Sequence, residues 1–223
     1  MRATIVMAQY GQPQLTIACV QSLRRQHGDE RPMIPVDDGS SPADLEQVAR
    51  ACLSNVELVC SPHRGVTAAW NAGAARASGD RLLFLNNDVI TAGPWIDRML
   101  QPVSDRRIVI AGVARRRERH VPAAVLERLS TSTFASGWCF AVRRRDFESV
   151  GGFRESLRLY FSDTDLQARL LLRHGCGREG IAISEGLPVK HLGHATTSGC
   201  PTRRAQWQAD RQRFLELWGD TTA

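Results

Sequence analysis

The chain has 223 residues, which suits one large or two small domains. Its apolar fraction of 43% and charged fraction of 23% are ordinary for a globular protein, and they exclude disordered, collagen-like and coiled-coil chains. The net charge is +6, and Lys190 is the only lysine, so arginine carries nearly all of the positive charge. Arginine binds planar anions, which favours phosphate-bearing partners, although a GC-rich genome explains the same composition.

Hydropathy and cysteine usage indicate a cytoplasmic protein. No apolar run approaches the roughly 20 residues of a membrane helix, and the first residues lack the apolar core of a signal peptide. The six cysteines are scattered, without a Cys-x-x-Cys pair, and most lie in apolar segments. We therefore expect a reducing compartment and no structural zinc.

The first half of the chain alternates between strand and helix patterns. Strands are predicted over 3–8, 33–36, 56–60 and 81–85, and helices over 14–26, from Pro42 behind the N-cap Ser41, and over 67–77. Near-continuous apolar strands between helices predict a parallel sheet with both faces covered. Ligands of such sheets bind outside the carboxyl ends of the strands.

The second half is less regular. Strands are predicted over 108–113, 137–142, 181–183 and 188–190, helices over 162–174 and 202–218, and a basic loop over 115–119. With no repeat or linker, we expect an α/β fold in one domain, residues 1–223, whose mixed sheet is mostly parallel. Its expected parts are a nucleotide-sugar-binding half at 1–103, an acceptor and catalytic half at 104–200, and a C-terminal helix at 201–223.

Polar clusters follow three of the predicted strands, at 9–12, 37–40 and 86–88. A carboxylate in the second cluster, Asp37 or Asp38, accepts hydrogen bonds from a base or a ribose, while a simple turn explains Asp-Gly-Ser equally well. Asp88 in the third cluster is a hard oxygen ligand suited to Mg²⁺ or Mn²⁺ alongside substrate phosphates. A turn or a helix cap is the alternative there.

The segment 162–165, Ser-Asp-Thr-Asp, also has two interpretations. Ser162 and Asp165 fit a capping box at a helix start, which needs no chemistry. Alternatively, Asp163 is a general base. The spacing of these residues does not decide between the capping box and the general base.

Four further features are ambiguous in the same way. His191 and His194 lie on a loop of small residues, where they reach a metal or a phosphate or serve only as structural residues. Trp138 stacks on a sugar or belongs to the core. The basic segment 115–119 is a solvated loop, an acceptor-binding loop or a contact to an anionic membrane surface.

Taken together, these motifs resemble the family 2 glycosyltransferases of the GT-A fold, with Asn-Asn-Asp similar to a rhamnosyltransferase-like branch. The resemblance runs from about Ala3 to about Gly199. It rests on Leu23, Gln26 and Val36-Asp37-Asp38-Gly39-Ser40; on Gly65, Asn71-Ala72-Gly73, Ala77, Gly79-Asp80 and Phe84-Leu85-Asn86-Asn87-Asp88; on Gly137, Val142-Arg143-Arg144 and Gly151-Gly152-Phe153; and on Phe161-Ser162-Asp163-Thr164-Asp165-Leu166, Arg169 and His191.

The resemblance implies roles for particular residues. Asp163 matches the catalytic base, Asp88 and His191 match metal-binding positions, and Trp138 and Asp165 are expected at the acceptor. The donor nucleotide-sugar is expected to contact Ala8, Gln9, Tyr10, Asp37, Asp38, Arg64, Asn71, Asn86, Asn87 and Asp88. Three positions depart from the usual pattern of the family. This chain has Gly11 where many members have Asn, Asn86 where the DxD motif has its first Asp, and Ser162 where the motif around the base has Glu.

The implied activity is an inverting transfer of a sugar from a nucleoside-diphosphate sugar to an acceptor hydroxyl, assisted by Mn²⁺ or Mg²⁺. Arg64, Arg203 or Arg204 would assist the departing diphosphate, and a closing loop near His191 would exclude water. A glycan, a lipid-linked saccharide or a small molecule is the expected acceptor, at the inner face of the membrane or in the cytoplasm.

Two other functions fit the sequence less well than sugar transfer does. A sugar nucleotidyltransferase needs a Gly-rich, basic phosphate loop after the first strand, but segment 9–13 has a single glycine. A non-catalytic anion or nucleic-acid binder needs basic residues interleaved with aromatic ones, and segment 115–119 has no aromatic residue. No nucleic-acid partner is therefore expected.

Overall fold

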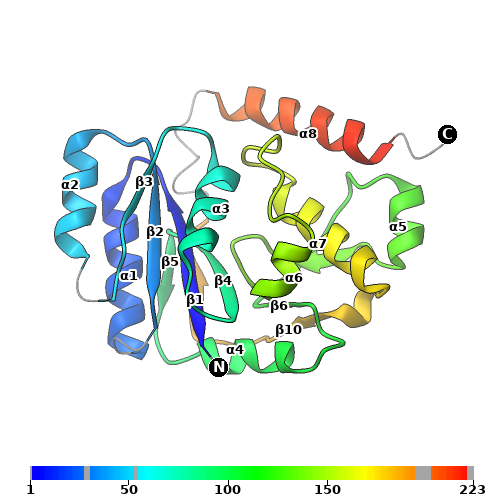
Figure 1. The fold of residues 1–223 in the computed structure, drawn as a ribbon, viewed down its shortest axis with the longest axis horizontal. Coiled ribbons are helices and arrows are strands. Elements are labelled where there is room, and N and C mark those ends of the chain that lie inside the picture. Colours follow the sequence, from blue (N-terminus) through cyan, green and yellow to red (C-terminus); the bar gives the residue numbers. More distant parts are fainter. Residues whose placement is uncertain (1, 28–30, 53–54, 194–201, 220–223) are drawn as a thin grey trace.

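The first half of the chain alternates between strands and helices, as the sequence predicts (Figure 1). The computed structural model describes residues 2–27, 31–52, 55–193 and 202–219. Ser41 is the N-cap of the second helix, where its Oγ accepts the backbone N–H of Asp44 over 3.2 Å. The elements of this half are β1 (Ala3–Gln9), α1 (Pro13–His27), β2 (Met33–Asp38), α2 (Pro42–Ala51), β3 (Val59–Ser61), α3 (Val66–Arg76) and β4 (Arg81–Asn86).

The second half contains shorter elements, several of which the sequence pattern does not reveal. They are β5 (Val89–Thr91), α4 (Ile96–Leu100), β6 (Ile110–Gly112), β7 (Arg115–Arg117), α5 (Ala123–Leu129), β8 (Thr133–Ala135), β9 (Cys139–Arg143), α6 (Arg144–Ser149), α7 (Ser162–His174), β10 (Ile181–Ile183), β11 (Val189–His191) and α8 (Arg203–Gly219). Segments of three to seven residues, such as β5 and α5, are too short to show a periodic apolar pattern.

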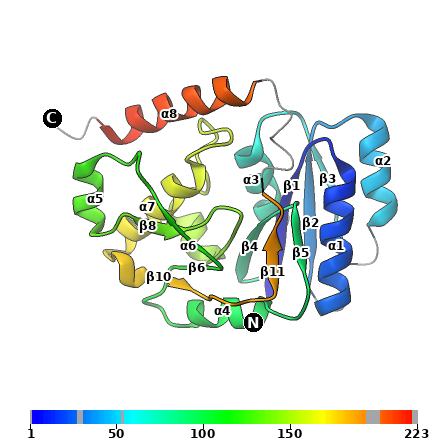
Figure 2. The ribbon, with the colours of Figure 1, turned by 180° about the vertical axis from the view of Figure 1, so that it is seen from behind.

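The main sheet has seven strands in the order β10-β6-β9-β4-β1-β2-β3. Neighbouring strands are parallel except at β9, which runs antiparallel to both β4 and β6. This confirms the predicted mixed, mostly parallel sheet. Two small antiparallel pairs, β11 with β5 and β7 with β8, lie outside it. Figure 2 shows β11 beside β5.

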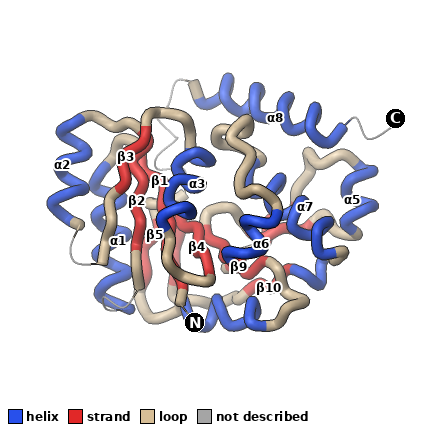
Figure 3. The backbone as a smooth tube through the Cα atoms, in the orientation of Figure 1, coloured by secondary structure: helices blue, strands red, loops and turns tan. Residues whose placement is uncertain are grey.

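Helices cover both faces of this sheet, with α1 and α3 on opposite sides (Figures 1 and 2). Figure 3 shows the strands lying between the helices. Alternate residues of each strand face opposite ways. Ile5 and Met7 of β1 therefore pack with residues of α1 and α4, whereas Val6 packs with residues of α3, α6 and α7. One apolar layer therefore packs against each face of the sheet, and the polar strand ends lie outside both layers.

The segment 115–119 is not the loop that the sequence predicted. Residues 115–117 form β7, whose backbone pairs with Thr133–Ala135 of β8. The side chains of Arg115 and Arg117 stay exposed, so the strand forms without burying charge. Charged side chains are uncommon in strands, and pairing with β8 supplies the backbone hydrogen bonds that outweigh this preference.

Helix α8 lies across the second half of the molecule (Figure 1). It looks polar in sequence, yet Phe214, Trp218 and Asp210 are buried. Asp210 accepts the backbone N–H groups of Arg158, Leu159 and Tyr160 over 2.8–3.1 Å. The helix thereby secures the segment that leads into α7. Within the described residues, no helix has both the length and the apolar character needed to cross a membrane.

Candidate functional site

The polar ends of three neighbouring strands meet at one edge of the sheet. In the strand register, Ala8 of β1 lies between Val36 of β2 and Asn86 of β4, and Gln9 lies opposite Asp37. The three polar clusters that follow these strands are therefore adjacent. This confirms the expectation drawn from the parallel arrangement of the strands.

Asp37 stabilises the turn that follows β2. Its side chain is 2% exposed and accepts the side-chain N–H of Gln9, while its second oxygen accepts the backbone N–H groups of Gly39 and Ser40. Gln9, 1% exposed, also donates to Ser40 Oγ over 2.8 Å. Internal partners thus occupy both buried side chains, and a donor contact of Asp37 and Gln9 stays a prediction.

Asp38 is buried beside a loop that comes before α3. Its carboxylate accepts the backbone N–H groups of Arg64, over 2.8 Å, and Gly65, over 2.9 Å, and lies 3.1 Å from Nδ1 of His63. The imidazole of His63 in turn stacks on the ring of Tyr10, with centroids 4.3 Å apart. Asp38 and the exposed Tyr10 therefore come together at the end of the sheet, as the sequence predicted.

Arg64 and Asn71 both reach the segment that follows α6. Arg64 pairs with Glu155, and Asn71 donates to Glu155 and to the backbone oxygen of Phe153 over 2.9 Å. The side-chain oxygen of Asn71 also accepts the backbone N–H of Phe153. These bonds tie α3 to the second half of the chain. The amide of Asn71 therefore bonds inside the protein, and its donor contact stays a prediction.

Asp88 and His191 form a polar contact at the end of β4. Nε2 of His191 lies 3.0 Å from Oδ1 of Asp88, which is 3% exposed, and 3.4 Å from Nδ2 of Asn86. The register of β11 against β5 sets this contact, because His191 lies opposite Val89. The backbone N–H of Leu192 also donates to the backbone oxygen of Asp88. His194 lies outside the described residues.

Asn87 points away from this contact. Its side chain is 4% exposed and donates to Thr16 of α1 over 3.0 Å. Asn87 follows the end of β4, and its bond to Thr16 directs it toward α1. A donor contact of Asn87 stays a prediction.

Asp163 faces a guanidinium. Nη2 of Arg116 donates to Oδ2 of Asp163 over 2.6 Å and to Thr164 over 2.6 Å, while Nη1 donates to Glu118 over 3.0 Å. The negative charge of Asp163, followed by that of Glu118, raises the pKa of Arg116. Sequence reasoning missed Arg116 as the partner of Asp163 and the buried Glu118 as the partner of Arg116 and Thr164, because β7 and the start of α7 lie more than forty positions apart.

Asp165 is an interior residue. It is 0% exposed, and Arg154, Arg169 and the indole N–H of Trp218 hold its two oxygens over 2.8–3.0 Å. Internal partners therefore occupy this enclosed carboxylate, and its acceptor contact stays a prediction. The capping-box interpretation of Ser162 and Asp165 is wrong, since the N-cap is Phe161 in a left-handed conformation.

Gly137 and Trp138 link the two groups of functional residues. A Cβ at Gly137 would lie 2.3 Å from Oδ2 of Asp163, so only glycine lets the backbone pass this closely. The next side chain, Trp138, stacks on His191 with centroids 5.0 Å apart. Its backbone oxygen accepts the N–H of Asn86 over 2.8 Å. Two adjacent residues therefore contact both the Asp163 and the Asp88–His191 groups, and the partly buried Trp138 also packs against the apolar core.

Comparison with solved structures shows the same fold. The mannosyltransferase PcManGT from Pyrobaculum calidifontis, in complex with GDP-Man and Mn²⁺, matches 100% of this chain with a TM-score of 0.73 at 18% identity. GalNAc-T7 with UDP, GalNAc and Mn²⁺ matches 76% of the chain with a TM-score of 0.60 at 15% identity. This chain spans 65% and 40% of the lengths of these two chains.

The family is shown by sequence. No curated protein matches the chain. Residues 4–165 match the family model described as glycosyl transferase family 2, and this range contains the polar strand ends, Gly137 and Asp163. The fold, a mixed sheet flanked by helices, agrees with that of the GT-A glycosyltransferases. The chain therefore belongs to glycosyl transferase family 2.

Proposed function

We propose that this glycosyltransferase moves a sugar from a nucleoside-diphosphate sugar to an acceptor hydroxyl with inversion at the anomeric carbon. One observation carries the proposal: Gly137 and Trp138 bring a carboxylate, Asp163, next to the Asp88–His191 contact. A general base and a diphosphate-binding group must both approach the anomeric carbon, and the contacts of these adjacent residues with both groups support a single shared site.

The nucleoside is proposed to bind at the Asp38 end of the edge. Asp38 already accepts backbone N–H groups, so the exposed Tyr10 and half-exposed His63 provide the accessible surface, an aromatic face for a base. PcManGT was solved with GDP-Man, which supports a donor of this class.

Asp88 and His191 fit a divalent cation. Carboxylate oxygen and imidazole nitrogen are common ligands of Mn²⁺. Oδ1 of Asp88 and Nε2 of His191 lie 3.0 Å apart, so both residues would be able to hold one ion. Both solved neighbours were determined with Mn²⁺, which supports the choice. When bound, such an ion neutralises charge on the departing diphosphate.

Asp163 is the proposed general base. One oxygen of its carboxylate takes the proton of the acceptor hydroxyl while the hydroxyl oxygen bonds to the anomeric carbon and the bond from that carbon to the diphosphate oxygen breaks. Arg116 holds the other oxygen of Asp163, which fixes the carboxylate in place. A single displacement of this kind inverts the anomeric carbon.

A thermal-shift panel tests the proposal. Nucleoside diphosphates and nucleotide-sugars are added with and without Mn²⁺, and a true donor raises Tm by mass action in the presence of the ion. NMR of the transfer product then reports the anomeric configuration. If no nucleotide-sugar raises Tm and none is consumed, the proposal is wrong.

A further inference from the structure

A short loop, residues 62–65, joins β3 to α3 and encloses the buried carboxylate of Asp38. The backbone N–H of Arg64 donates to Oδ1 of this carboxylate over 2.8 Å, and that of Gly65 donates to Oδ2 over 2.9 Å. Nδ1 of His63 lies 3.1 Å from Oδ2. The loop therefore directs the nitrogen atoms of consecutive residues to one buried negative charge.

The carbonyl groups of the same loop face a guanidinium. Nε of Arg158 donates to the backbone oxygen of Arg64 over 3.1 Å, and Nη2 donates to that of His63 over 3.3 Å. The His63 oxygen and the Arg64 N–H belong to one peptide group, and the Arg64 oxygen and the Gly65 N–H belong to the next. Each of these peptide groups thus donates to Asp38 on one side and accepts from Arg158 on the other.

This arrangement lets Arg158 act on Asp38 without touching it. The dipole of each peptide group lies between a negative and a positive charge, and hydrogen bonds in such a chain strengthen one another. Among the described residues, no carboxylate pairs with Arg158, so the loop carbonyls are the acceptors of its guanidinium. Gly65 permits the close packing, because its φ is +102° and a Cβ there would lie 2.7 Å from the backbone oxygen of Arg158.

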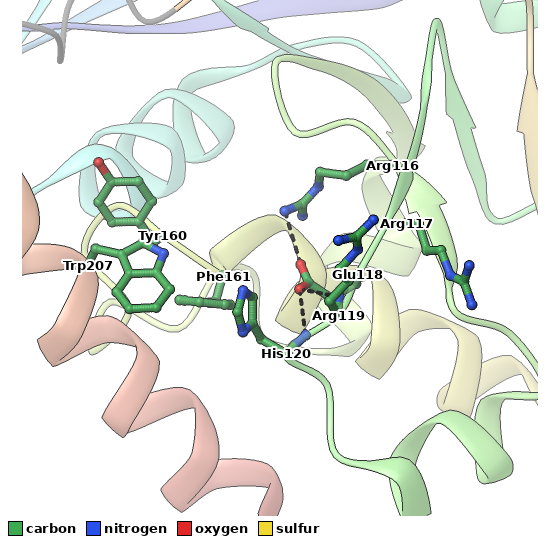
Figure 4. Close-up of a pocket in the computed structure, with 8 residues that line it drawn as sticks. All are labelled: Arg116, Arg117, Glu118, Arg119, His120, Tyr160, Phe161 and Trp207. Atoms are coloured by element: carbon green, nitrogen blue, oxygen red, sulfur yellow. Dashed lines mark hydrogen bonds and ion pairs between the residues drawn. The ribbon is translucent and has the colours of Figure 1, made fainter.

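Helix α8 sets the position of Arg158. The backbone N–H of Arg158 donates over 3.1 Å to Asp210 of this helix, which is 1% exposed. Figure 4 shows Phe161, shortly after Arg158 in the chain, beside Trp207 of α8, and the centroids of these two rings lie 6.0 Å apart. The helix lies beyond residues 4–165, so the support of Arg158 comes from outside the range that matches the family model.

We propose that Arg158 is a positioning residue for the nucleoside of the donor. The inference rests on the proposed function, which has the nucleoside at Tyr10 and His63. Because the guanidinium of Arg158 holds the backbone oxygen of His63, it fixes the residue whose ring stacks on Tyr10, together with the peptide groups that hold Asp38. The free protein then already has the shape that the base meets, and binding requires less ordering of the loop.

Calorimetry with two kinds of probe tests this proposal. GDP, UDP and dTDP, each with Mn²⁺, report on the whole donor site, whereas inorganic pyrophosphate with Mn²⁺ reports on the proposed Asp88–His191 end. Arg158→Gln should weaken binding of the tightest nucleotide by roughly tenfold, since it removes hydrogen bonds from a charged donor, and should leave pyrophosphate binding within about twofold. Equal weakening of both probes would indicate a general structural effect and would overturn the proposal.

Hydrogen exchange distinguishes an effect through the loop from direct contact with the nucleotide. Without ligand, the amides of Arg64 and Gly65 should exchange faster in Arg158→Gln than in the unaltered protein, while those of β1 should not change. Weaker nucleotide binding without faster exchange at these two amides would mean that Arg158 touches the ligand itself, and the positioning role would be wrong.

Two control variants accompany this one. Arg173→Gln removes the same charge at an exposed position in the last turn of α7 and should leave nucleotide binding unchanged. Arg158→Lys keeps the charge but has a single donor nitrogen, so it should recover part of the affinity. An equal loss in Arg173→Gln contradicts the proposal. Failure of all three nucleotides to bind the unaltered protein counts against the proposed function, whereas normal nucleotide binding by Arg158→Gln counts against the role of Arg158 alone.

Discussion

The indole of Trp138 lies flat against the imidazole of His191, with ring planes 5° apart and centroids 5.0 Å apart. The stack restricts rotation of the imidazole while its Nε2 faces Asp88. The backbone oxygen of Trp138 also accepts the N–H of Asn86. These two contacts of Trp138 connect three elements: the end of β4, the start of β9, and β11. A side chain that sequence alone suggests is a core residue or a sugar platform thus positions a proposed metal ligand.

Replacing Trp138 with Leu should weaken Mn²⁺-dependent binding of nucleoside diphosphate by roughly tenfold, because groups that orient a metal ligand have effects of this size. Calorimetry with and without Mn²⁺ measures the change. Trp138→Phe retains a flat ring and should lose less. Equal affinity in the Leu variant and the unaltered protein would show that the stack has no such role.

Replacing Asp88 with Ala should abolish the Mn²⁺-dependent part of nucleoside diphosphate binding, since the variant keeps only His191 of the proposed ligand pair. The residual affinity should equal that of the unaltered protein in EDTA. Asp80→Ala is a suitable control, because Asp80 lies at the start of β4 and its carboxylate pairs with Arg81 on the surface. Titration curves that coincide for Asp88→Ala and the unaltered protein would contradict the metal assignment.

Replacing Asp163 with Asn should reduce transfer by roughly 10²–10⁴-fold, the usual contribution of a general base. The amide keeps the shape of the carboxylate, so donor binding should remain. Single-turnover transfer and calorimetry with nucleoside diphosphate separate the two effects. Near-normal turnover would show that Asp163 is not the base.

Replacing Asp165 with Ala should lower the free energy of unfolding by roughly 3–5 kcal/mol, because the change leaves Arg169 and the indole of Trp218 without their buried acceptor. Urea unfolding measures the loss. Asp97→Ala, which removes an exposed ion pair with Arg31, should cost less than about 1 kcal/mol. A stable Asp165→Ala variant with an altered KM for acceptor would instead support the expected acceptor contact.

Replacing Asp210 with Asn should destabilise the protein by roughly 1–3 kcal/mol, because an amide has one acceptor oxygen where the carboxylate accepts backbone N–H groups with both. Hydrogen exchange at residues 158–160 should rise more than exchange in β1. Uniform exchange across the chain would show that α8 does not secure this segment.

The amino-acid sequence was sufficient for the central architecture and for the meeting of three polar clusters at one edge of the sheet. Apolar strands between amphipathic helices predicted the mixed sheet, because period and length identify such elements without tertiary information. The polar residues after 8, 36 and 85 were correctly expected at one edge, since parallel strands end on the same side of a sheet. Asp38, Asp88 and Tyr10 follow from this rule alone.

Only the tertiary structure decided which polar side chains face outward. Asp37, Asn71, Asn87 and Asp165 carry the same functional groups as the site residues, yet internal partners occupy each of them. These partners come from distant segments, so no local pattern indicates them. The same holds for Arg116, which reaches Asp163 only because β7 pairs with β8 and brings the arginine to the start of α7. Burial and hydrogen bonding between distant segments determine which carboxylate is available for chemistry, and both arise only when the chain has packed.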